Sequence, residues 1–152
     1  MMRAGQRPSL IRVGYERFDG YLDGGLAAWQ AAALPTAAFE SIDTDTLYRR
    51  WQQKPDMTII DVRRDDEWRA GHIPGALHFH LGDLPRRIDE VPRDQPITLI
   101  CQGGYRAEIA ASMLVAAGRH VIAVCGGGMG NWIEQGLPSA AGVDNQVTHA
   151  HP

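Results

Sequence analysis

The chain has 152 residues, about the length of one domain. It is 44% hydrophobic and 22% charged, and its net charge of −3 argues against nucleic acid as the main partner. Its apolar runs are far shorter than the ~18 residues that span a membrane, and its first residues lack the apolar core of a signal peptide. Two cysteines cannot build a disulfide framework. We therefore expect a soluble, cytoplasmic protein that contacts no membrane.

The N-terminal segment, residues 1–36, resembles a later part of the same chain. Corresponding residues are 103 positions apart in every case: Gly24 and Gly127, Gly25 and Gly128, Trp29 and Trp132, Leu34 and Leu137, Pro35 and Pro138. A constant separation is typical of an internal repeat, and a coincidental helix start is the alternative. We expect this segment to be the end of a preceding domain of the same kind. It would dock as a helix on the intact domain or mediate a homodimer.

From residue 37 to residue 89, short strands alternate with helices. We expect strands at 37–41, 57–62 and 76–79, since the run at 57–62 is continuously apolar, as parallel sheets require. A helix capped by Asp43 or Thr44 should run to about Gln53, and a shorter one should cover 65–70. A turn at 71–75 and one or two helical turns within 81–89 complete this half. The inward side chains should be Leu47, Tyr48, Trp51, Trp68, Leu84 and Ile88.

The second half adds strands at 97–100 and 121–124 and a last helix at 129–135. Between these strands lies a helix whose apolar face should comprise Ile109, Ala110, Met113, Leu114 and Ala117, with Gly118 as its left-handed cap. We expect residues 140–152 to be disordered. The alternation predicts an α/β fold in which a parallel five-stranded sheet carries helices on both faces. Ligands of such sheets bind outside the carboxyl ends of the strands.

Cys101 stands at such an end, directly after the strand at 97–100 and before a helix. The N–H groups and partial positive charge of a helix N-terminus stabilise a thiolate over a thiol, which makes a cysteine nucleophilic. Gly103 and Gly104 allow successive N–H groups to turn inward, and Arg106 adds a fixed positive charge. The alternative is a small buried hydrophobe without chemistry.

Three motifs, in this order, resemble the rhodanese-type sulfurtransferases over about residues 40–139. The first is Ile59-Ile60-Asp61-Val62-Arg63 with Glu67 and Gly71-His72-Ile73-Pro74-Gly75-Ala76; the second is Cys-x-x-Gly-x-Arg at 101–106; the third is Gly126-Gly127-Gly128-Met129 with Trp132. The resemblance implies one rhodanese-like domain at 37–139. It also implies that residues 1–36 are similar to the tail of a second such domain, as in fusions of a metallo-hydrolase with rhodanese modules.

The resemblance implies that Cys101 takes a sulfane sulfur from thiosulfate or a thiol persulfide and passes it to a thiol or cyanide. The amides of Gln102, Gly103, Gly104, Tyr105 and Arg106 would hold the anionic sulfur, and neither cofactor nor metal is expected. Arg106 would stabilise the charge or orient the loop through a carboxylate. Gln102 and Tyr105 could contact donor or acceptor. Because many family loops carry a positive charge where Gln102 stands, a donor such as glutathione persulfide stays open.

Four further residues receive mainly structural roles. Asp61 and Arg63 should link the strand end to nearby loops, with Glu67 as a partner for Arg63. We expect His72 to be a structural turn residue rather than a general base. Cys125 should be a buried structural cysteine, with a resolving thiol as the alternative.

Two other functions remain open from the sequence. Phosphatases and arsenate reductases share a loop between cysteine and arginine, but they need five residues there, whereas four lie between Cys101 and Arg106. A non-catalytic interaction or regulatory module is the other alternative, because many rhodanese-like domains have lost the cysteine.

Overall fold

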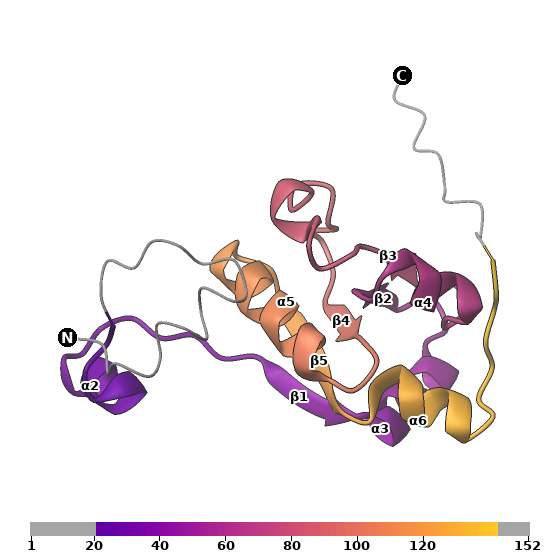
Figure 1. Cartoon of the computed structure of the whole chain (residues 1–152), viewed down its shortest axis with the longest axis horizontal. Helices are drawn as coiled ribbons and strands as arrows, with labels where there is room; N and C mark the ends of the chain where they lie inside the picture. The colour runs from indigo at the N-terminus through magenta and orange to yellow at the C-terminus, as the bar shows by residue number, and fades with distance from the viewer. Residues whose placement is uncertain (1–20, 143–152) are drawn as a thin grey trace. The chain divides into compact units, whose positions relative to one another are not determined.

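The computed structural model describes residues 21–142 (Figure 1). The chain divides into two compact units, residues 1–36 and residues 37–152, and each is described by itself. Within the described part, none of the helices is both long enough and apolar enough to cross a membrane.

The first unit contributes helix α2, Gly25–Ala31, which follows Gly24 in a left-handed conformation with φ of 77°. The indole Nε1 of Trp29 donates to the carbonyl of Pro35 at 2.9 Å and so closes the turn behind the helix. No residue of α2 is buried. Among the described residues of this unit, Leu26 is 63% exposed and Trp29 is partly buried.

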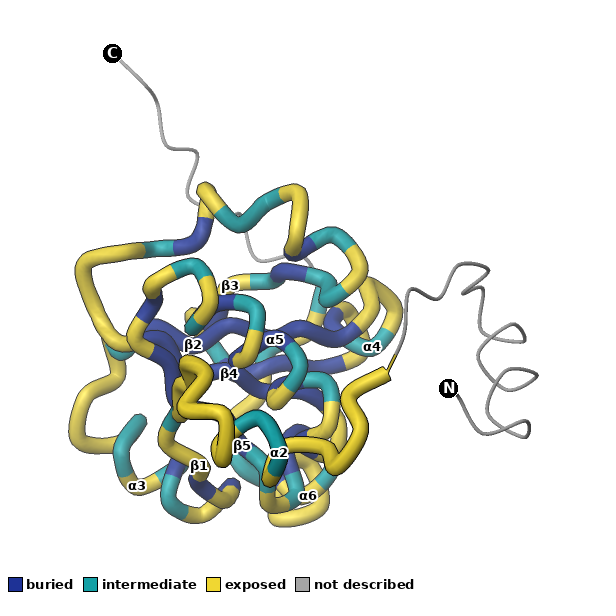
Figure 2. The backbone as a smooth tube through the Cα atoms, turned by 90° about the vertical axis from the view of Figure 1, so that its left-hand side faces the viewer, coloured by how far each residue is buried: buried dark blue, intermediate teal, exposed yellow. Residues whose placement is uncertain are grey.

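The second unit is built on one sheet of five strands, and every strand pairing is parallel. The strands are β1 (Glu40–Asp43), β2 (Thr58–Asp61), β3 (Leu77–His78), β4 (Ile97–Ile100) and β5 (Val121–Gly126). Their order is β1-β5-β4-β2-β3, as Figure 1 shows. Every residue of β2 and β4 is buried (Figure 2), which explains why both strands are apolar or β-branched except at Asp61, the last residue of β2.

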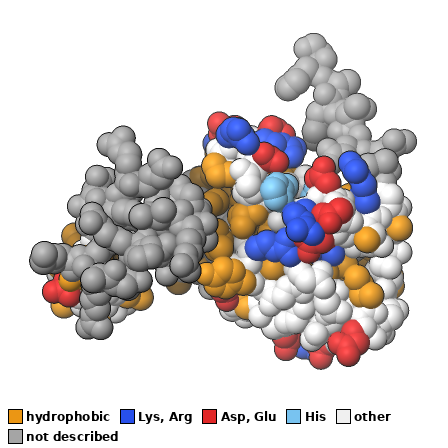
Figure 3. Space-filling view, in the orientation of Figure 1, with side chains coloured by type: hydrophobic (Ala, Val, Ile, Leu, Met, Phe, Trp, Pro, Cys, Tyr) orange, Lys and Arg blue, Asp and Glu red, His pale blue; other side chains and the backbone are white. Residues whose placement is uncertain are grey.

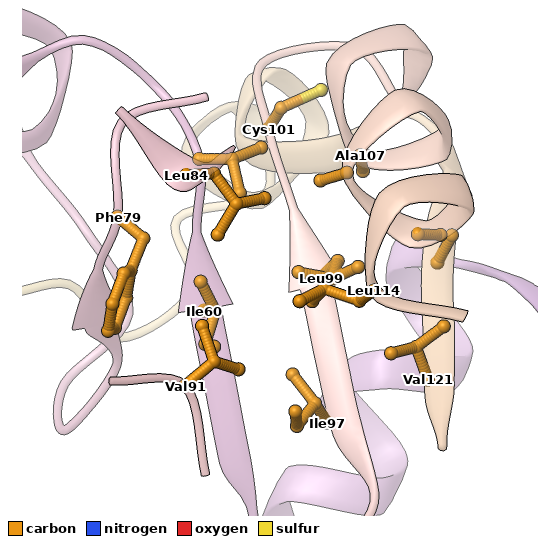
Figure 4. Close-up of a cluster of buried hydrophobic side chains, with 14 residues drawn as sticks. Ile60, Phe79, Leu84, Val91, Ile97, Leu99, Cys101, Ala107, Leu114 and Val121 are labelled. Carbon is orange, nitrogen blue, oxygen red and sulfur yellow. The ribbon is translucent and has the colours of Figure 1, made fainter. Parts of the chain in front are cut away.

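Helices cover both faces of this sheet. Helix α5 (Tyr105–Ala116) and the 3-10 turn η1 (Leu84–Arg86) pack on one face, in the cluster that contains Ile60, Leu99 and Leu114 (Figure 4). Helices α3 (Thr44–Gln53), α4 (Asp65–Ala70) and α6 (Gly128–Glu134) belong to the opposite face. Alternate strand residues supply the two clusters, because successive side chains of a strand point to opposite faces. The predicted five-stranded parallel α/β fold is thus confirmed.

Most predicted elements appear within a few residues of their expected bounds. Asp43 caps α3, since its side chain accepts a hydrogen bond from the N–H of Thr46 at 2.7 Å. The first strand is displaced: residues 40–43 form it, rather than 37–41. On α5 the buried residues are Ala107, Ala110, Ala111 and Leu114. The predicted face was therefore rotated, with only Ala110 and Leu114 placed correctly as buried.

The expectation of disorder from residue 140 onward was wrong for its first residues. His72 and Ala140 exchange two backbone hydrogen bonds of 2.9 Å, and Gly142 donates to the carbonyl of Arg69. These bonds tie the chain back to the turn after α4. The rest of that prediction, and the start of the N-terminal segment, lie outside the described residues.

Candidate active site

Cys101 lies immediately after β4, the middle strand of the sheet. Figure 4 shows its sulfur directed toward the start of α5. The Sγ atom accepts a hydrogen bond from the N–H of Gly104 at 3.1 Å, so one predicted inward amide is in place. Cys101 is nevertheless only 1% exposed, although its loop neighbours Gln102, Gly103 and Tyr105 are exposed. A reagent can therefore reach the thiol only if this loop moves.

The first turn of α6 holds the beginning of the cysteine loop. The N–H of Met129 donates to the carbonyl of Cys101 at 2.9 Å, and the N–H of Gly130 donates to the carbonyl of Gln102 at 3.0 Å. Gly128 makes this approach possible, because a Cβ there would lie 2.3 Å from the Cys101 carbonyl oxygen. Sequence reasoning missed this clamp, although the three consecutive glycines at 126–128 are its signal.

Of the two loop glycines, only Gly104 is required by geometry. Its φ is 109°, and a Cβ on it would lie 2.6 Å from the carbonyl oxygen of Cys125. Gly103 has no positive φ and open space where a Cβ would be. The prediction that both glycines bend the loop therefore holds for Gly104 and fails for Gly103.

Arg106 fixes the other end of the loop through a carboxylate. Its two terminal nitrogens each donate to Glu67 at 2.7 Å, in a bidentate pair with α4. The bonds from Arg106 are the main cause that lowers the pKa of Glu67 from 4.5 to about 2, and Glu67 in turn raises the pKa of Arg106. Of the two predicted roles for Arg106, the structure shows the orienting one.

Asp61 and Arg63 form a buried ion pair at the end of β2, with 2.7 Å between Arg63 Nη2 and Asp61 Oδ2. Arg63 also donates to the carbonyl of Gly71 at 2.6 Å and to Oε1 of Gln102 at 3.4 Å. One guanidinium thus joins a strand end, the turn after α4 and the cysteine loop. The predicted architectural role is observed, but Glu67 as the partner of Arg63 was wrong, because Arg106 binds that carboxylate.

His72 and Cys125 were the two remaining residues with expected structural roles. The His72 ring is buried and stacks on Trp68, with 3.5 Å between ring centroids, and its Nδ1 lies 3.0 Å from the Trp68 carbonyl. Cys125 is half-buried against the α5 cluster, and burial raises the pKa of its thiol. His72 is buried, as a structural turn residue would be, whereas Cys125 was expected to be buried and is only partly so.

The surface near the loop carries few unpaired charges. Both arginines that reach the cysteine loop, Arg63 and Arg106, are bound to carboxylates. Figure 3 shows basic and acidic side chains intermixed on the face that it presents. Tyr105, 77% exposed, stands at the start of α5 as the large apolar group of the loop.

Known proteins are similar to this chain in sequence. A sulfurtransferase from Allochromatium vinosum is 31% identical over 100 residues, which are 66% of this chain and 94% of that protein. An HTH-type transcriptional regulator from Mycobacterium tuberculosis is 35% identical over 101 residues, covering 65% of this chain and 44% of the regulator.

Solved structures agree. A rhodanese-related protein from Thermoplasma volcanium superposes with a TM-score of 0.60 at 27% identity, covering 67% of this chain and 98% of that one. The polysulfide-sulfur transferase homodimer from Wolinella succinogenes gives a TM-score of 0.57 at 30% identity, with coverage of 85% and 95%. The sequence profile of the rhodanese-like domain matches residues 44–135, from the start of α3 to the end of α6. The chain therefore belongs to the rhodanese-like domain family.

Proposed function

We propose that the protein is a sulfurtransferase in which Cys101 carries the sulfur as a persulfide. The observation that carries this proposal is the Cys101 sulfur at the end of the middle strand, within 3.1 Å of the Gly104 N–H. The relatives named sulfurtransferase support the same activity. Both cysteines are free, and a reducing compartment would keep them so; we therefore place the activity in the cytoplasm.

The transfer needs no external oxidant or reductant. The Cys101 thiolate attacks the sulfane sulfur of the donor, its S–S bond breaks, and the donor leaves with the electron pair as a thiolate or as sulfite. The enzyme then holds a persulfide, whose terminal sulfur is attacked by an acceptor thiolate or by cyanide. Cleavage of the second S–S bond releases the acceptor persulfide or thiocyanate and restores the Cys101 thiolate. The Gly104 N–H is placed to donate to the sulfur while it is anionic.

The charges around the loop favour a thiol persulfide over thiosulfate as the donor. Thiosulfate is a dianion, and binding it calls for a cation that is not already neutralised. Arg63 and Arg106 are both paired with carboxylates, and Gln102 is neutral. A thiol persulfide can instead place its organic part against the exposed ring of Tyr105.

The buried thiol means that turnover includes a movement of the loop. Cys101 is 1% exposed, whereas Gly103 is exposed and has open space where a side chain would be. The segment around Gly103 is the part of the loop that can shift without breaking a clamp. We therefore expect donor access past Gln102 and Gly103.

The test is the intact mass of the protein after exposure to glutathione persulfide or thiosulfate. We expect an added ~32 Da, one sulfur atom, on the wild type and on Cys125→Ser, and no addition on Cys101→Ser. Cys125→Ser is the matched control, because it removes the other free thiol. Cyanide-dependent thiocyanate release by Cys101→Ser at the wild-type rate would contradict the role of Cys101.

A non-catalytic module is the second candidate, and the covered thiol is the observation that favours it. The regulator from Mycobacterium tuberculosis joins a similar domain to other sequence, since this chain matches 44% of it. The absence of any sulfur adduct at Cys101 would favour this function. A phosphatase is disfavoured, because Arg106 is bound to Glu67 instead of being free for an oxyanion.

A further inference from the structure

Two segments of the chain, residues 24–36 and residues 127–139, have the same local structure. Each is a seven-residue helix preceded by a glycine with positive φ, Gly24 in one and Gly127 in the other. Three hydrogen bonds of the first segment recur in the second, 103 residues later. In the first segment they are Ala28 N to Gly24 O, Leu34 N to Trp29 O and Trp29 Nε1 to Pro35 O. In the second they are Asn131 N to Gly127 O, Leu137 N to Trp132 O and Trp132 Nε1 to Pro138 O. The sequence repeat is therefore a structural repeat.

The left-handed residue that ends each helix strengthens the match. Gly136 has φ of 66°, and its counterpart Ala33 has φ of 53°. Ala33 is the only described non-glycine residue with positive φ, a conformation that alanine disfavours. A coincidental helix start would not require this strained residue at the corresponding position.

In the second unit this corner segment closes the body of the fold. Trp132 is 0% exposed, and its ring meets the edges of Tyr48 and Trp51 of α3 at centroid distances of 5.6 and 5.9 Å. Met129 is also 0% exposed, and its N–H binds the Cys101 carbonyl. The segment thus fills an aromatic surface on α3 and clamps the cysteine loop.

The N-terminal copy carries apolar side chains at the corresponding positions, and in the part of the first unit that the structure describes they are exposed or only partly buried. Leu26, the counterpart of Met129, is 63% exposed, and Leu34, the counterpart of Leu137, is 42% exposed. Trp29 makes the same indole hydrogen bond as Trp132, but Trp29 is only partly buried. The described part of the first unit offers no sheet to cover these side chains.

We propose that residues 24–36 bind to a second rhodanese-like domain that lacks the helix corresponding to α6. In that domain they would complete the fold as residues 127–139 do in this one. Leu26 and Trp29 would enter the positions that Met129 and Trp132 fill in this chain. A second copy of this chain is not the expected partner, because its α3 surface is already covered by its own α6. A second copy of this chain, bound through this segment in a homodimer, is thus the competing partner.

The test is a graft within the full chain, in which residues 128–137 take the sequence of residues 25–34. If the grafted residues pack on α3 as α6 does, the fold is preserved, and we expect the melting temperature to fall by no more than ~5 °C. A control graft has the same composition, but the residues from Leu26 and Trp29 are moved to solvent-facing positions. It should melt at least ~10 °C below the wild type.

A second graft protects this test from two local clashes. Gly130→Ala places a Cβ 3.2 Å from the Gln102 carbonyl, and Gly136→Ala meets a positive φ. The second graft keeps both glycines and exchanges only Met129, Asn131, Ile133, Glu134 and Gln135 for their counterparts. If this graft melts as low as the rearranged control, the proposal is wrong. Melting is read without substrate, so the result is independent of the sulfur-transfer assay.

Sedimentation equilibrium of the full chain distinguishes the competing partner. We expect a monomer at micromolar concentration, with Leu26→Glu causing no change in mass. A dimer that Leu26→Glu dissociates would make a second copy the partner and would overturn the proposal.

Discussion

Replacing Glu67 by Gln should change how the stability of the protein depends on pH. Glutamine preserves the bond to the Arg64 N–H at the start of α4, because both residue types serve at this capping position. It removes the charge that pairs with Arg106 and one of the two oxygens that accept from the guanidinium, because the amide nitrogen of glutamine is a donor. The substitution therefore isolates the electrostatic clamp on the cysteine loop from the structure of the helix.

The magnitude follows from the pKa of Glu67, which is about 2 in the folded protein against an ordinary 4.5. This difference corresponds to at most ~3 kcal/mol of folding free energy, at about 1.4 kcal/mol for each pH unit. Solvent screens the pair, since the side chains of Arg106 and Glu67 are 30% and 19% exposed, so we expect about 1–2 kcal/mol. Because the folded pKa is depressed, this stability is complete above pH 4.5 and is lost as the pH falls toward 2.

Urea unfolding at a series of pH values from 7 to 2 measures this contribution. Above about pH 5 the wild type should exceed Glu67→Gln by ~1–2 kcal/mol, and the two should converge near pH 2. Asp66→Asn is the matched control on the same helix turn; its carboxylate is exposed and pairs with Arg64, so the difference from wild type should be unresolved. A constant difference between wild type and Glu67→Gln across the whole range would refute the reasoning.

Three further substitutions test the frame of the site. Gly104→Ala should lower the unfolding free energy by several kcal/mol and abolish sulfur transfer, because its Cβ would lie 2.6 Å from the Cys125 carbonyl; Gly103→Ala, with open space, should behave as wild type in both assays. Arg63→Leu should cost ~3–5 kcal/mol in urea unfolding, since it leaves a buried carboxylate unpaired, and a cost below ~1 kcal/mol would contradict the role of this pair. Trp132→Phe should cost ~2–3 kcal/mol, because it loses the indole hydrogen bond and leaves a cavity beside Tyr48 and Trp51, and unchanged thermal unfolding would contradict this packing.

The sequence predicted the fold because its signals are local. The apolar runs at β2 and β4, the cap at Asp43 and the buried Trp68 each depend on a few neighbouring residues, and all were confirmed. The buried face of α5 could not be predicted in the same way. Apolar residues surround most of that helix, so periodicity could not distinguish Ala107 and Ala111 from Ile109 and Met113.

The ion pairs of the site escaped prediction because they join distant parts of the chain. Glu67 and Arg106 are 39 residues apart, and only the parallel pairing of β2 with β4 brings the segments that follow these strands together. Arg63 lies nearer to Glu67 in sequence, but its own strand supplies Asp61 two residues earlier. Residue spacing alone favoured the wrong partner.

These contacts together explain how a covered thiol and a transfer function can occur in one protein. α6 holds the carbonyls of Cys101 and Gln102, and Glu67 holds Arg106 at the far end of the loop. Both sets of bonds act on the ends of the loop, whereas Gly103 between them is exposed and has open space where a side chain would be. A donor can therefore displace the middle of the loop while the Gly104 N–H stays beside the sulfur. If movement at Gly103 admits the donor, Gly103→Pro, which fixes φ there and removes the N–H, should slow alkylation of Cys101. Equal alkylation rates in the wild type and this variant would place the entry route elsewhere.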